Sequence, residues 1–218
     1  MHKPNNILES DVQEELDWDP LFDNSRVIVK AHEGYVTLTG AVDTYYDTIL
    51  ATDDAWSVSG VKSVDNELLV GLVGDAIADD DVAASCVDAL DRDRLVPKGA
   101  INVTVVDGWV TLSGEVRRHY QRQAAHHAVS RVDGVLGVTN DITLTKGAMP
   151  SDVADRINKA FRRHAIIDDS LIEVTSGVDN TIYLDGTVGS WYAMEEAVDT
   201  AWRAPGVSDV ENRLVVVP

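Results

Sequence analysis

Arginine and histidine side chains gather in one short stretch of the chain, residues 117–127, which reads RRHYQRQAAHH. His119 and His126 are seven residues apart and would share one side of a helix, whereas His127 would point elsewhere. A metal site would need further ligands within reach, and the sequence shows none. The stretch therefore predicts an electrostatic site for an anionic partner, formed by Arg117, Arg118, His119, Arg122 and His126.

The overall charge makes this basic stretch stand out. The 218 residues include 18 Lys and Arg against 37 Asp and Glu, a formal net charge of −19. Such a surface repels nucleic-acid phosphates at long range, so we expect no nucleic-acid partner. When the chain is divided after Gly74 and Gly147, the thirds carry net charges of −10, −3 and −6. The basic stretch lies in the least acidic third. It could bind a separate partner, dock on an acidic neighbouring module, or simply be a solvated helix face.

Other reactive side chains do not form a catalytic pattern. The single cysteine, Cys86, aligns with Leu16 and Ile157 on an apolar helix face, which predicts a core residue. A phosphate-binding glycine loop, a Gly-x-Ser-x-Gly elbow, a His-Glu-x-x-His motif and a paired-cysteine zinc pattern are all missing from the sequence. We therefore expect no catalytic residue, no metal site and no cofactor, and we predict that the protein is not an enzyme.

A seven-residue motif, called the phrase below, occurs three times. It indicates the secondary-structure elements that position the side chains of the basic stretch. It reads GYVTLTG at 34–40, GWVTLSG at 108–114 and NTIYLDG at 180–186. Measured from the last glycine of the phrase, every copy has a second glycine 20 residues later and an asparagine 26 residues later. The recurring residues are Gly40, Gly60 and Asn66; Gly114, Gly134 and Asn140; and Gly186, Gly206 and Asn212. Three identical spacings indicate a tandem repeat.

Each copy predicts the same order of secondary structure. Alternating β-branched and polar residues flank the turn pairs EG, DG and DN, as in a β-hairpin with positive φ at the turn, including Gly34 and Gly108. An amphipathic helix follows the phrase, with Tyr46, Tyr120 and Tyr192 at one shared position, and a last strand follows the second glycine. A further helix precedes each hairpin, with Asp11, Asp81 and Asp152 predicted as N-caps or first-turn acids.

The predicted fold class is α+β. Three αββαβ modules, at residues 1–74, 75–147 and 148–218, would each form a small three-stranded mixed sheet with two helices on one face. We expect Asn66, Asn140 and Asn212 to close the turn after the preceding glycine with a side-chain hydrogen bond, rather than to bind a ligand. Trp56 and Trp202 share one helix position and predict packing between modules.

The repeated pattern resembles the BON domain, named for bacterial osmotically induced and nodulation proteins. The residues that carry the resemblance are the phrase Gly-x-Val-x-Leu-x-Gly-x-Val and the ending Gly-Val-x-x-Val-x-Asn. The third copy departs from the phrase, with Asn180 at the first glycine. The resemblance covers nearly the whole chain and implies a non-enzymatic binding role connected with osmotic or envelope stress.

The N-terminal sequence and the cysteine content bear on where the protein is located. The N-terminal residues lack the apolar stretch of a secretory signal, and one cysteine fits a reducing compartment, so we expect a cytoplasmic protein. The leading hypothesis is a binding or scaffold protein whose partner is another protein or its own neighbouring modules. Because some members of the resembled family bind anionic phospholipid and one type senses potassium, two alternatives remain: binding of a membrane surface through the second module, and binding of a monovalent cation.

Overall fold

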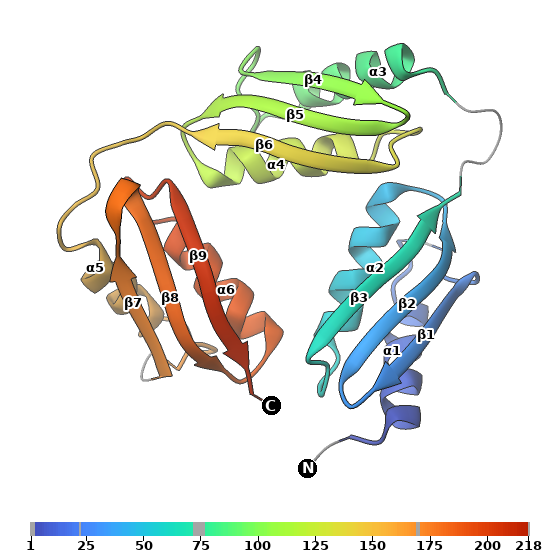
Figure 1. Ribbon diagram of the computed structural model, residues 1–218, viewed down its shortest axis with the longest axis horizontal. Coiled ribbons are helices and arrows are strands. Elements are labelled where there is room, and N and C mark those ends of the chain that lie inside the picture. Colours follow the sequence, from blue (N-terminus) through green and yellow to red (C-terminus); the bar gives the residue numbers. More distant parts are fainter. Residues whose placement is uncertain (1–2, 22, 72–76, 169–170, 218) are drawn as a thin grey trace. The chain divides into compact units, whose positions relative to one another are not determined.

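The computed structural model describes residues 3–21, 23–71, 77–168 and 171–217, which form three copies of one small α+β module (Figure 1). The predicted fold class is therefore confirmed. The chain divides into two compact units, Met1–Val116 with Tyr120–Thr143, and Arg117–His119 with Leu144–Pro218. The predicted boundary between residues 74 and 75 lies outside the described residues.

The elements follow the same order in every copy. The first copy contains α1 (Asn5–Trp18), β1 (Val27–His32), β2 (Tyr35–Val42), α2 (Tyr45–Ser57) and β3 (Ser63–Val70). The second contains α3 (Asp79–Arg92), β4 (Ile101–Val106), β5 (Trp109–Val116), α4 (His119–Ser130) and β6 (Gly137–Leu144). The third contains α5 (Val153–Phe161), β7 (Ile172–Ser176), the 3₁₀ turn η2 (Val178–Asn180), β8 (Thr181–Val188), α6 (Trp191–Trp202) and β9 (Asp209–Val216).

The second strand of each copy is the centre of a three-stranded sheet, in the orders β1-β2-β3, β4-β5-β6 and β7-β8-β9. In the first copy β1 pairs with β2 antiparallel and β2 pairs with β3 parallel, so that Leu38 lies opposite both Val29 and Asn66. The third copy repeats this mixed arrangement, with Leu184 opposite Val174 and Asn212. The helix between the last two strands provides the crossover that a parallel pair requires.

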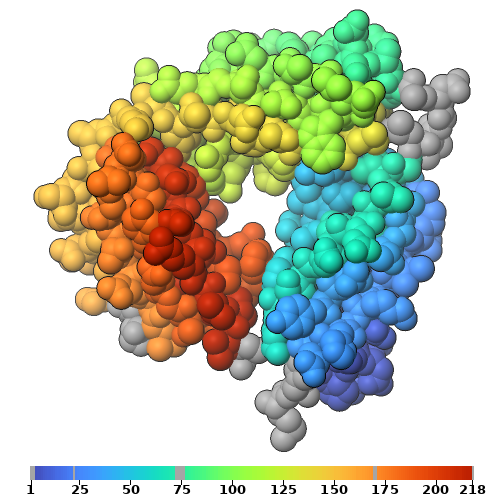
Figure 2. Space-filling view, viewed as in Figure 1, coloured from blue at the N-terminus to red at the C-terminus, as the bar shows by residue number. Residues whose placement is uncertain are grey.

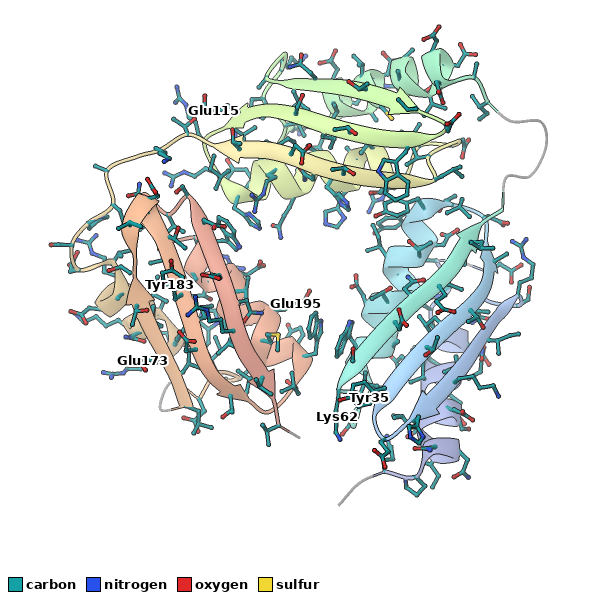
Figure 3. All side chains as sticks on the ribbon, in the orientation of Figure 1. Tyr35, Lys62, Glu115, Glu173, Tyr183 and Glu195 are labelled. Atoms are coloured by element: carbon teal, nitrogen blue, oxygen red, sulfur yellow. The ribbon has the colours of Figure 1, made fainter. Side chains whose placement is uncertain are left out.

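One face of each sheet is buried beneath two helices (Figure 1). In the first copy every second residue of β1 is buried, and α1 contributes Leu8, Val12 and Leu16, each fully buried. The opposite face carries side chains such as exposed Tyr35 of β2 and half-buried Tyr183 of β8 (labelled in Figure 3). Figure 2 shows the outer faces of the β1–β3 and β7–β9 sheets open to the viewer. The apolar core of each module therefore lies only between its sheet and its helices.

The last glycine of each repeated phrase is fixed by a close approach of two strands. Gly40, Gly114 and Gly186 have φ values of 121°, 138° and 133°. A Cβ atom on Gly114 would overlap the carbonyl oxygen of Ala100, just before the neighbouring strand, and the other two glycines meet an equivalent carbonyl. Because both the backbone conformation and the space exclude a side chain, only glycine fits here.

In the first two copies the first helix binds the turn of its hairpin. Asp107 and Gly108 both have positive φ, and their N–H groups donate to the carboxylate of Asp79 at 2.8 and 2.9 Å. In the first copy the N–H of Glu33 donates to the side-chain oxygen of Asn5 at 2.9 Å. These hydrogen bonds satisfy turn amides that strand pairing leaves without partners, and they hold the hairpin against the helix.

The repeated asparagines are structural, but their hydrogen bonds differ from the prediction. Asn66 does not close the turn after Gly60; its Nδ2 donates to the carbonyl of Thr48 within α2 at 2.8 Å, and its Oδ1 accepts from the N–H of Leu68 at 2.9 Å. Asn140 makes the equivalent pair, to the carbonyl of Arg122 and from the N–H of Ile142. The side chain points from the third strand to the crossover helix, so it joins these two elements.

The capping role expected for Asp11 needs correction. Asp11 lies in the middle of α1 instead of capping it, because the apolar row of α1 begins one turn earlier, at Leu8. Asp81 is a first-turn acid of α3, and Asp152 occupies the N-cap of α5 without a side-chain cap bond. The tyrosines at the shared helix position are not core residues: Tyr120 and Tyr192 are exposed, since the stripe buried by the helix runs through its alanines.

Replacing Asn140 with alanine should lower the free energy of unfolding by about 1–2 kcal/mol, because a helix carbonyl and a strand amide both lose a partner. Urea denaturation followed by circular dichroism measures the change. Asn102→Ala is the matched control, since Asn102 is exposed on the outer face of the same sheet. Equal losses in the two variants would contradict the structural role of Asn140.

Candidate functional site

The five residues of the predicted anion site are divided between the two compact units. Arg117, Arg118 and His119 belong to the second compact unit, whereas Arg122 and His126 belong to the first. Arg117 and Arg118 are exposed and precede α4, which begins at His119. The sequence predicted that all five cluster on one helix, but α4 starts too late for the two arginines to be part of it.

Arg117, Arg118 and His119 line a cavity of about 500 Å³ in the second unit, which we call the 117–119 pocket. Its other lining residues come from positions 145–148, where the second copy meets the third, and from the end of α6 and the segment after it, including Trp202 and Gly206. Two guanidinium groups and an imidazole lie in this lining, which contains no carboxylate. Because guanidinium binds carboxylate and phosphate oxygens with paired donors, the pocket suits an anionic group.

An aromatic stack forms part of the pocket wall. The rings of His119 and Trp202 lie 4.1 Å apart and nearly parallel, with an interplanar angle of 6°. Trp202 also packs against the core of the third copy. The sequence predicted packing between modules for Trp202, and its ring does meet His119 of the second copy. The two residues are 83 positions apart, so the sequence did not identify this particular partner.

Gly206 brings two backbone segments together at the same pocket. Its φ is 80°, and a Cβ atom there would come within 2.6 Å of both the carbonyl oxygen of Ala148 and the Cα of Met149. The close approach therefore requires glycine. It packs the segment after α6 against residues 148–149, and Ala148 also lines the pocket.

His126 is a packing residue within the first unit. Its ring meets the ring of Tyr45 from α2 edge-on, with centroids 6.3 Å apart. Burial lowers the pKa of His126, and the neighbouring His127 lowers it further. A histidine that is neutral at pH 7 contributes little to binding an anion, so the electrostatic role predicted for His126 is not favoured.

A cation–π contact that the sequence did not suggest lies nearby. The guanidinium carbon of Arg131 is 4.3 Å from the centre of the Tyr46 ring, and its Nη2 donates to the Tyr46 hydroxyl at 2.8 Å. The contact joins the end of α4 to α2 within the first unit. Arg131 is thus a positive charge of the second copy that is already engaged with an aromatic ring.

Cys86 lies in the core, as predicted. Its side chain is fully buried on α3, and burial raises the pKa of the thiol to about 11. The aligned residues Leu16 and Ile157 are buried too. Because the thiolate is the reactive species, this cysteine is chemically inert in the folded state.

A thiol reagent such as DTNB should therefore label Cys86 only as fast as the second copy opens or unfolds. The labelling rate at pH 8 is expected to lie orders of magnitude below that of the urea-unfolded chain. Stopped-flow absorbance measures both rates. Rapid labelling of the native protein would contradict the inert, buried assignment.

Where α1 packs against α2 in the first copy, several acidic side chains lie around Asp54. Asp54 of α2 has one carboxylate oxygen, Oδ2, that is buried without a hydrogen-bond partner in the described structure. Burial is the largest effect that raises the pKa of Asp54, to about 6, and the negative charges of Asp19, Glu15 and Asp53 raise it further. The first copy thus holds a carboxyl group that is harder to ionise than usual.

Replacing Asp54 with asparagine should make stability less dependent on pH. The raised pKa means that the folded state binds a proton more tightly than the unfolded state, so Asp54 favours folding below about pH 4 and loses that contribution as the pH rises through about 6. Asp54→Asn should therefore be more stable than the wild type by about 1–2 kcal/mol at pH 8, after allowance for solvent screening. Thermal unfolding at pH 4 and pH 8 tests this; a difference that does not depend on pH would contradict it.

The described residues contain no group of three or more His, Cys, Asp or Glu side chains arranged to hold a metal ion. Among the helices that the structure describes, none combines the length and apolar character needed to cross a membrane.

A family comparison matches residues 4–71, 78–146 and 151–218 to the BON domain. The chain belongs to the BON domain family. The three matched segments agree with the tandem repeat derived from the glycine and asparagine spacing, and each contains one sheet with its two helices.

A relative of this BON protein is known from Escherichia coli (strain K12), where it is called osmotically-inducible protein Y. The two are 32% identical over 125 residues, which cover 53% of this chain and 60% of the relative. The match thus spans less than two thirds of the relative's length.

Among solved structures, the C-terminal domain of CdsD, a structural protein of the type III secretion system of Chlamydia trachomatis, aligns with 99% of this chain and 100% of its own. The identity is 17% and the TM-score 0.25. A second CdsD structure gives 18% and 0.24, with 97% and 93% coverage. TM-scores this low add nothing to the assignment.

Proposed function

We propose that this protein is a non-enzymatic, stress-related binding protein of three BON modules, and that it binds an anionic group in the 117–119 pocket. The family and the similarity to an osmotically-inducible protein support the general role. The observation that carries the specific site is the pocket lining, which has two arginines, a histidine and no carboxylate in a chain of net charge −19.

The overall negative charge does not prevent such binding. At physiological ionic strength the screening length is about 8 Å, so a group inside the pocket responds mainly to the charges that line it. A long polyanion such as a nucleic acid would also meet the acidic remainder of the surface and be repelled. The pocket therefore favours a compact anionic group, such as a carboxylate on a partner protein.

The aromatic stack of His119 and Trp202 adds an apolar wall to the basic lining. A partner that presents an acidic group next to an apolar side chain would bury both in one place, and buried apolar area adds to the affinity. This combination favours a protein partner in the cytoplasm, where the protein is predicted to act, with a phospholipid headgroup as the alternative source of the anion.

Charge reversal at the pocket tests the proposal. The double variant Arg117→Glu, Arg118→Glu should weaken retention of the bound partner by roughly tenfold or more, because two attractions become repulsions. The matched control is Arg92→Glu, Arg94→Glu, which makes the same charge change in the same copy, on residues that do not line the pocket.

The measurement is affinity capture from lysate at low and high salt, together with co-sedimentation with phosphatidylglycerol and phosphatidylcholine vesicles. A salt-sensitive protein partner lost only from the pocket variant supports the proposal. Binding to phosphatidylglycerol vesicles alone would assign the anion to a membrane surface. Equal behaviour of the wild type, the pocket variant and the control would reject an anionic partner at this site.

A further inference from the structure

A second basic cavity lies entirely within the third copy, in the groove between α5 and α6. Its volume is about 300 Å³, at the small end of the range for ligand pockets. The lining side chains that matter for binding are those of Arg156, Arg163, His164, Thr200 and Arg203. None of the lining residues is acidic, but the Glu196 carboxylate pairs with two of them, His164 at 3.1 Å and Arg203 at 3.5 Å. The groove shares almost none of its lining with the 117–119 pocket.

The hydroxyl of Thr200 is the decisive feature of this groove. Thr200 is only 6% exposed, and its Oγ1 has no hydrogen-bond partner in the described structure. A helical threonine usually satisfies its hydroxyl with a carbonyl one turn earlier. Thr52 of α2 does so, with its Oγ1 donating to the carbonyl of Thr48 at 2.8 Å. A buried hydroxyl without such a bond is costly. Thr200 lines the cavity, but its Oγ1 is itself buried, so a small rotation of the side chain is needed before it can donate to a ligand there.

The arginines of the groove keep much of their side chains exposed while they make ion pairs or a backbone hydrogen bond. Arg156 pairs with Asp152 at 2.9 Å, and Arg203 lies 3.5 Å from Glu196, in each case with more than half of the arginine side chain exposed. Arg163 donates to the carbonyl of Lys159 at 2.8 Å. Exposed ion pairs contribute little stability, so these guanidinium groups can turn toward a bound anion at small cost.

The position of the groove at the C-terminal ends of two helices would normally disfavour an anion, because free carbonyls point that way. Several of those carbonyls already have donors. The N–H groups of Arg162 and Arg163 donate to carbonyls of α5, and the N–H of Arg203 donates to the carbonyls of Ala201 and Asp199 in α6. Their partial charge toward the groove is reduced accordingly.

The same groove in the first copy has the opposite charge. By the spacing of the repeat, Glu15 and Asp54 occupy the positions of Arg156 and Thr200. Glu15 is among the charges that raise the pKa of Asp54, which places the two side chains near each other. One backbone arrangement thus carries an acidic groove in one copy and a basic groove in another, so the basic side chains are not required by the fold.

We propose that the α5–α6 groove binds the phosphate group of a small soluble compound, with Thr200 Oγ1 and the guanidinium groups of Arg156 and Arg163 donating to its oxygens. A phosphate accepts more hydrogen bonds than one carboxylate, and its geometry matches the paired donors of arginine. This site is separate from the proposed function, because the residues that would hold the phosphate do not line the 117–119 pocket.

Thr200→Val gives a test with two opposite effects. Valine keeps the shape and removes the unpaired hydroxyl, so in phosphate-free buffer the Tm should rise by about 2 °C or more. The same change removes a phosphate donor, so the affinity for inorganic phosphate should fall roughly tenfold. Thr175→Val is the matched control, because Thr175 is exposed on β7, and it should leave the phosphate affinity unchanged.

Both measurements use the full chain. Isothermal titration gives the affinity for inorganic phosphate, and thermal unfolding compares the Tm in phosphate and in chloride at equal ionic strength. Arg163→Gln should also lose the phosphate-dependent rise in Tm, whereas Arg117→Glu with Arg118→Glu should keep it. The latter variant distinguishes failure of this proposal from failure of the proposed function.

The proposal would be overturned if chloride raised the Tm as much as phosphate does. It would also be overturned if Thr200→Val bound phosphate as tightly as the wild type. Glycerol 3-phosphate and vesicles containing phosphatidic acid distinguish the source of the phosphate. Binding of glycerol 3-phosphate supports a soluble compound, and binding to the vesicles alone would overturn that assignment.

Discussion

The packing of two helices on one face of a three-stranded sheet is the constraint on which each module depends. A unit of about 70 residues has a small core, so nearly all of its large apolar side chains must meet between the sheet and the helices. The anchor glycine allows the first two strands to approach, and the strand-three asparagine joins the sheet to the crossover helix. Because these contacts maintain the fold, the side chains on the outer sheet face and in the groove between the helices can differ from copy to copy.

The groove between the helices shows how much this freedom permits. It carries Glu15 and Asp54 in the first copy, Ser85 and Ala128 in the second, and Arg156 and Thr200 in the third. The surrounding core residues change little in character, as buried Leu16, Cys86 and Ile157 illustrate. Three copies of one fold can therefore present three different surfaces, and any binding function must be argued from each copy's own side chains.

The sequence predicted the fold well because its signals are local and repeated. Strand alternation, turn residues with positive φ and constant spacing from Gly40, Gly114 and Gly186 depend on the chain nearby. The sites were harder to predict, since they depend on contacts between distant residues. Trp202 meets His119 only in the folded chain, and Thr200 gives no sequence signal, because a lone helical threonine normally bonds its own backbone.

Ala128 of the second copy shows which residue type is more stable at this position of the helix. Ala128 has no polar group to satisfy, whereas its counterparts in the outer copies each bury an oxygen that lacks a partner. Selection for thermal robustness alone would favour a small apolar residue at all three places. A more heat-stable variant of this chain would therefore start from substitutions at Asp54 and Thr200. Such substitutions would remove any ligand binding that the two unpaired oxygens support.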